Sequence, residues 1–79
     1  MTLDSLKPGE TARIVAVDWA ILAPEEGKRL RALGFDEGAE VGVSYRGVLA
    51  GSDPLAVTVG RMTVAMRRTH AAAMRIERD

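Results

Sequence analysis

The strongest constraint on the fold is one short helical segment with a clear start and a clear stop. Pro24 stands where proline is tolerated in a first helical turn, and the two glutamates after it complement the positive end of the helix dipole. Leu30 and Leu33 share one face, and Gly34 follows where a helix commonly ends in a left-handed residue. Because Phe35 comes next, we expect a Schellman motif in which Phe35 contacts Leu30.

Segments rich in β-branched residues surround this helix and predict strands. The first spans residues 11–18, after a Pro8-Gly9 pair that fits a type II turn. Its apolar residues are nearly continuous, so we expect burial on much of both faces. Further strands are expected at residues 41–45, 55–59, 62–66 and 74–77, with a tight turn at 60–61 and a short helical turn within 67–73. One helix among several short strands predicts a mainly β fold, a small closed or partly open barrel.

The length and composition limit what such a chain can do. With 79 residues we expect a single domain, residues 1–79, with a small core. Eleven basic residues balance eleven acidic ones, so no global field draws in nucleic acid or an anionic membrane. The N-terminus has no signal-peptide pattern, no apolar run could span a bilayer, and there is no cysteine. We therefore expect a soluble, cytoplasmic protein.

Residues for catalysis or metal binding do not gather in the sequence. His70 is the single histidine, and nothing in its spacing from the serines suggests a catalytic triad. Transition-metal sites usually need several histidines or cysteines, so we assign no metal ligands and expect His70 at the barrel rim. No glycine-rich phosphate loop is present either. The sequence predicts a binding protein, with no catalytic residues and no cofactor.

Three groups of residues, taken together and in this order, resemble the FeoA family. The opening matches in Leu3, Leu6, Lys7, Pro8, Gly9, Glu10, Ala12 and Ile14. The helix and its following turn match in Arg29, Leu30, Leu33, Gly34, Phe35, Gly38 and Val41. The tail matches in Asp53, Pro54, Gly60, Met66, Arg67, Ala71 and Ile76.

This resemblance implies an SH3-like β-barrel with one short helix inserted after the first strand. It also implies a role in ferrous-iron uptake, by docking on the cytosolic region of the membrane GTPase transporter FeoB. A similar module forms the C-terminal domain of some metal-dependent repressors, so a metal-sensing regulatory module is an alternative. A nucleic-acid-binding barrel is a second alternative, because several arginines gather in the second half of the chain.

Two apolar loops are the candidate partner-binding surfaces. The first holds Trp19, Ile21 and Leu22, where the FeoA family is often polar or glycine-rich. Tryptophan is enriched at interface hot spots, but these side chains could equally cover an open end of the barrel and complete a small core. The second surface is the loop around Val48 and Leu49, since loops on rigid scaffolds tend to carry function. Self-association through an exposed strand edge is also open.

Overall fold

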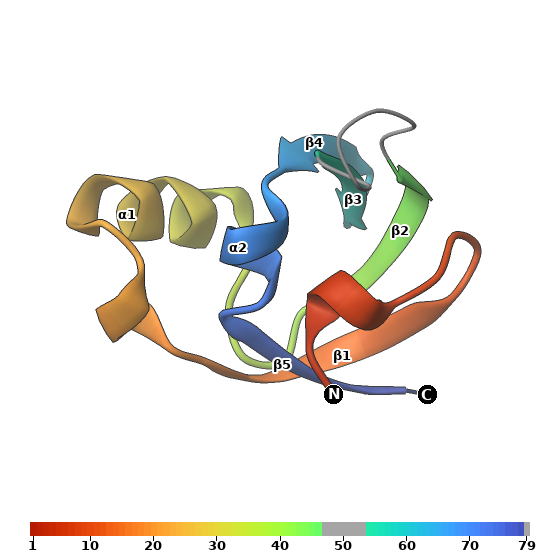
Figure 1. Ribbon diagram of the computed structural model, residues 1–79, viewed down its shortest axis with the longest axis horizontal. Coiled ribbons are helices and arrows are strands. Elements are labelled where there is room, and N and C mark those ends of the chain that lie inside the picture. The colour runs from red at the N-terminus through yellow and green to blue at the C-terminus, as the bar shows by residue number, and fades with distance from the viewer. Residues whose placement is uncertain (47–53, 79) are drawn as a thin grey trace.

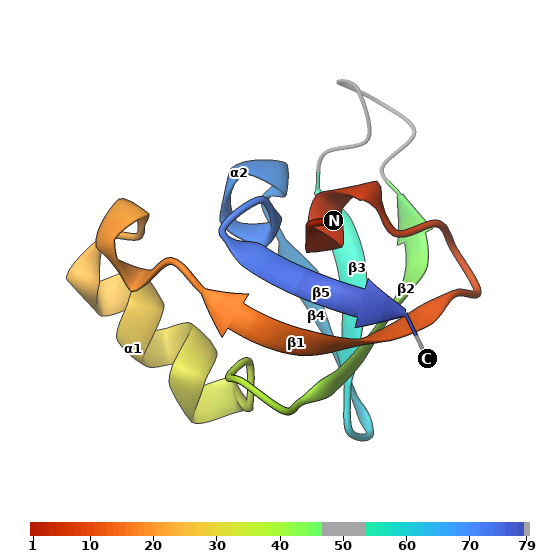
Figure 2. The ribbon, with the colours of Figure 1, turned by 90° about the horizontal axis from the view of Figure 1, so that it is seen from below.

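The computed structural model describes residues 1–46 and 54–78. Five antiparallel strands form one sheet in the order β4-β3-β2-β1-β5. The strands are β1 Thr11–Val17, β2 Glu40–Arg46, β3 Leu55–Val59, β4 Met62–Met66 and β5 Met74–Arg78. The sheet bends strongly around a central core, with β4 and β5 as its two edges (Figures 1 and 2). The predicted mainly β fold with few short helices is confirmed.

The burial of β1 differs from the sequence-based expectation. Ala12 and Ile14 are buried, whereas Thr11 and Arg13 between them are exposed. The strand pairs with β2 on one side and β5 on the other. The prediction of burial on much of both faces holds only in part: residues 15–17 are all partly buried, but in the first half of the strand only one face meets the core. A β-bulge between Ile14 and Ala16 leaves the second half of the strand partly buried.

Among the described residues, four short helical segments accompany the sheet. They are the 3₁₀ turns η1 Leu3–Ser5 and η2 Trp19–Ile21, and the helices α1 Pro24–Leu33 and α2 Arg68–Ala71. Both α-helices were predicted, but neither 3₁₀ turn was, because three residues are too few for a hydrophobic period to show. In the first turn region, Leu3 and Leu6 are completely buried. Next to it, the amide of Ile76 donates a hydrogen bond of 2.8 Å to the carbonyl of Met1, so the N-terminus is fastened to β5.

The end of α1 is the predicted Schellman motif. Gly34 adopts a left-handed conformation with φ of 108°. The amide of Phe35 donates to the carbonyl of Leu30 at 2.9 Å, and the amide of Gly34 donates to Arg31 at 3.0 Å. Leu30 and Phe35 are completely buried, so the helix end is held by core packing as well as by hydrogen bonds. Four residues later the amide of Gly38 donates to the carbonyl of Ile14 at 2.8 Å, which returns the chain to the sheet.

The core is a single cluster of small and branched side chains with one aromatic ring. It draws on strands β1, β2, β3 and β5, on one residue of β4, and on η1, α1 and α2. Its members are Leu3, Leu6, Ala12, Ile14, Leu22, Leu30, Phe35, Val41, Val43, Leu55, Val57, Val59, Met66, Ala71, Ala73, Met74 and Ile76. Trp19 is partly buried and packs against this cluster.

Two glycine substitutions test the helix stop. Gly34→Ala places a side chain in the left-handed region, so we expect the free energy of unfolding to fall by about 1–2 kcal/mol. Gly27→Ala makes the same chemical change inside the helix, where the new Cβ would lie 3.5 Å from Trp19 Cε3, an ordinary contact. It should raise that free energy by about 0.5–1 kcal/mol. Urea denaturation measures both, and a Gly34→Ala protein as stable as wild type would contradict the assigned role of Gly34.

Candidate docking surface

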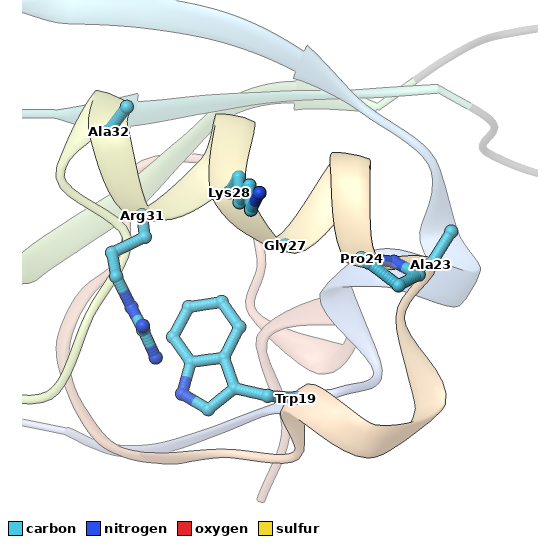
Figure 3. Close-up of a pocket in the computed structure, with 7 residues that line it drawn as sticks. All are labelled: Trp19, Ala23, Pro24, Gly27, Lys28, Arg31 and Ala32. Atoms are coloured by element: carbon cyan, nitrogen blue, oxygen red, sulfur yellow. The ribbon is translucent and has the colours of Figure 1, made fainter.

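Trp19 lies beside α1. One edge of its ring approaches the helix at Gly27, at a distance that would still admit a methyl group in ordinary contact. The guanidinium carbon of Arg31 sits 4.2 Å from the centroid of the indole ring (Figure 3). This distance is typical of a cation–π contact, which contributes about 0.5–1 kcal/mol at an exposed site. The ring is therefore held between the helix backbone and a positive charge.

A groove of about 370 Å³ runs between Trp19 and α1. The close-up shows the indole ring on one side and the helix on the other, with Arg31 reaching across toward the ring (Figure 3). The floor comes from small residues, and the charged side chains are both basic. The lining residues are Trp19, Ala23, Pro24, Gly27, Lys28, Arg31 and Ala32.

The residues predicted in the first loop separate in the structure. Ile21 is 63% exposed, the most exposed large hydrophobic side chain among the described residues. Leu22 is only 6% exposed and belongs to the core cluster. Trp19 stands between these cases, since it is partly buried, contacts the core and also lines the groove. The other predicted loop, with Val48 and Leu49, lies outside the described residues.

The sequence reasoning missed the contribution of α1 to this surface. Pro24, Gly27, Lys28 and Arg31 follow a spacing of three, four and seven residues, so they share one face of the helix. The face with Leu30 is buried in the core. The face with Lys28 and Arg31 carries no large apolar side chain, and both of these residues are exposed. The signal that could have found it is Gly27, because a glycine inside a helix often marks a packing contact. Here the ring of Trp19 lies next to Gly27, at a distance that would still admit a methyl group.

A second, polar cavity of about 280 Å³ lies on another side of α1, toward α2. Arg29 Nη2 donates to Glu26 Oε2 at 2.6 Å, and His70 Nδ1 lies 3.5 Å from the same oxygen. The hydrogen bond from Arg29 is the largest influence on the pKa of Glu26 and lowers it. Burial opposes this effect, and the charges of Arg29, His70 and Arg67 lower the pKa further. The cavity is lined by Glu26, Arg29, Pro54, Ala65, Arg67 and His70.

Several arginines outside both cavities pair with acids on neighbouring elements. Arg13 lies 3.7 Å from Glu40, and Arg78 lies 3.2 Å from Glu10. Such exposed pairs add little stability, but they neutralise local charge. Within residues 1–46 and 54–78, no three histidine, cysteine or acidic side chains come together as metal ligands would. In the same residues, no helix is both long enough and apolar enough to cross a bilayer.

Comparisons with known proteins agree with this fold. A family model described as the FeoA domain matches residues 1–78. No curated protein matches at a significant level. The chain is similar to solved FeoA structures that include one described as a prokaryotic SH3 domain protein, so the predicted family and SH3-like fold are confirmed.

Three of these structures show the extent of the similarity. The iron(II) transport protein A of Clostridium thermocellum is 27% identical, with a TM-score of 0.85 over 99% of this chain and 45% of that one. This chain thus spans less than half of the Clostridium protein. Stenotrophomonas maltophilia FeoA, complexed with zinc, is 32% identical, with a TM-score of 0.82 over 98% of this chain and 89% of that one. The FeoA protein of Chlorobium tepidum is 31% identical, with a TM-score of 0.85 over 99% and 70%.

The neighbouring residues Ile21 and Leu22 should respond very differently to truncation. Leu22→Ala leaves a cavity in the core, so we expect the free energy of unfolding to fall by about 2–5 kcal/mol. Ile21→Ala removes an exposed side chain and should change that free energy by no more than about 0.5 kcal/mol. Denaturation with urea measures both. Equal losses in the two variants would contradict the placement of this loop.

The contact between Arg29 and Glu26, both on α1, can be tested by titration. In Arg29→Gln the Glu26 carboxylate loses its charged donor, so its pKa should rise toward the ordinary value of 4.5. Because the native pKa is lowered, this contact stabilises the fold above pH 4.5, and the benefit is lost as the pH falls through the native pKa. Carbon-13 NMR of the carboxyl group measures the shift. Arg31→Gln removes the same charge two residues further on, on a different side of the helix, and should leave the pKa of Glu26 unchanged. An equal rise in both variants would refute the assignment.

Proposed function

We propose that this chain, which belongs to the FeoA family, is a non-enzymatic accessory protein of ferrous-iron uptake. It acts in the cytoplasm by contact with the cytosolic region of a FeoB-like membrane GTPase transporter. The observation that carries this proposal is the FeoA domain match over residues 1–78, which covers nearly the whole chain. The similarity to the iron(II) transport protein A of Clostridium thermocellum over 99% of this chain supports the same role.

The surface best suited to this contact is built from η2 and the outer side of α1. Ile21 offers an exposed apolar side chain, and Trp19 offers part of a large ring held in place by α1. A rigid aromatic residue beside exposed apolar area is typical of interface hot spots. Leu22, a predicted contact that is only 6% exposed, supports this surface from the core. Val48 and Leu49 stay as predicted contacts from the second loop.

A binding measurement with two matched variants tests this proposal. The wild-type chain should bind the purified cytosolic region of the FeoB-like transporter in isothermal titration calorimetry. Ile21→Ser should weaken that binding about tenfold, because it removes an apolar side chain from the interface. Met62→Ser removes another exposed large hydrophobic side chain, at the start of edge strand β4, and should bind like wild type.

Two results would count against the proposal in different ways. If the wild-type chain does not bind the transporter's cytosolic region, the proposed partner is wrong. If the wild type binds but Met62→Ser, rather than Ile21→Ser, loses affinity, the contact lies on the β4 edge of the sheet. Circular dichroism of both variants shows whether the fold is retained.

A further inference from the structure

We propose that the groove between Trp19 and α1 takes an acidic segment of a protein partner, with one apolar side chain of that segment seated against the indole ring. This inference rests on the proposed function and specifies the kind of segment that the transporter's cytosolic region would present. The residues concerned lie on α1, above all Lys28, and were not among the contacts predicted from the sequence.

The shape of the groove fits one anchoring side chain. Its floor is made by Ala23, Pro24 and Gly27, which project little or nothing from the helix. The ring of Trp19 forms the facing wall, with one edge near Gly27 and the guanidinium of Arg31 over its face. The volume of about 370 Å³ is near the lower end of the roughly 300–1,000 Å³ typical of ligand sites. A single apolar side chain fits a space of this size. Because the wall is already rigid, little conformational entropy is lost when that side chain binds.

The charges at the groove select an acidic occupant. Its two charged lining residues are Lys28 and Arg31, and no carboxylate is among the seven residues that line it. Lys28 is exposed. Arg31 is 58% exposed in its side chain and lies 3.7 Å from Asp36, which engages one edge of a guanidinium that carries five donors. A neighbouring carboxylate on the partner therefore meets two cations at the rim.

The number of cations separates a protein segment from other anionic partners. Lipid headgroups are usually recognised by clusters of about 4–8 basic residues, and specific nucleic-acid binding commonly uses about 6–10 phosphate contacts. Two cations beside an apolar wall suit a carboxylate next to a hydrophobic side chain. A second copy of this chain also carries exposed carboxylates, such as Glu25 and Glu37, so the test below includes a measurement of self-association.

Charge reversal at one position tests the inference. Lys28→Glu should weaken binding to the transporter's cytosolic region at least about tenfold, because it places like charges together. Lys7→Glu makes the same change in net charge in the turn before β1, whereas α1 follows the far end of that strand (Figure 2). It should bind within about twofold of wild type. In nitrogen-15 NMR of the labelled chain, the single tryptophan gives one indole N–H signal, which should shift when the unlabelled partner is added.

The possible outcomes separate this inference from the function on which it rests. If the wild type binds, but Lys28→Glu binds equally well and the indole signal does not move, the groove is not the docking site and the proposed function stands. If the wild type does not bind at all, both are overturned. If sedimentation shows a dimer of the wild type that Lys28→Glu dissociates, the groove is occupied by a second copy and the inference is overturned.

Discussion

The hydrogen bond from the amide of Phe35 to the carbonyl of Leu30 fixes the geometry on which the rest of the molecule depends. It ends α1 at Gly34 and brings two large side chains into the core within one turn of chain. The return at Gly38 then joins this turn to Ile14, so that β2 starts beside β1. In this way one helix end sets both the strand pairing at the centre of the sheet and the side of α1 that faces outward.

The outward side of α1 explains how one tryptophan serves two purposes. A core built largely from alanine, valine and leucine side chains gains from the apolar area of Trp19, which packs against it. The same ring is partly exposed, and one edge of it approaches α1 at Gly27. The loop thus divides by residue between core and surface. Leu22 is core, Ile21 is surface, and Trp19 packs against the core while staying partly exposed.

Much of the fold followed from local patterns, but the site did not. Strands β3 and β4 and the end of α1 were predicted residue by residue, because turn glycines and the Leu30–Phe35 pair are local signals. The first half of β1 is buried on one face and its second half is partly buried throughout, a change along the strand that depends on tertiary packing. The groove depends on η2 folding back onto α1, a tertiary contact. Lys28 gains its position only from that contact and was therefore not among the predicted residues.

In-cell photo-cross-linking from the groove measures most directly whether this chain docks on the transporter through α1. A benzophenone amino acid in place of Ala32, which is exposed and lines the groove, should cross-link to the FeoB-like transporter in growing cells. The same probe in place of Thr63, exposed on edge strand β4, should give no such product. A transporter cross-link from Thr63 and none from Ala32 would contradict docking through this groove.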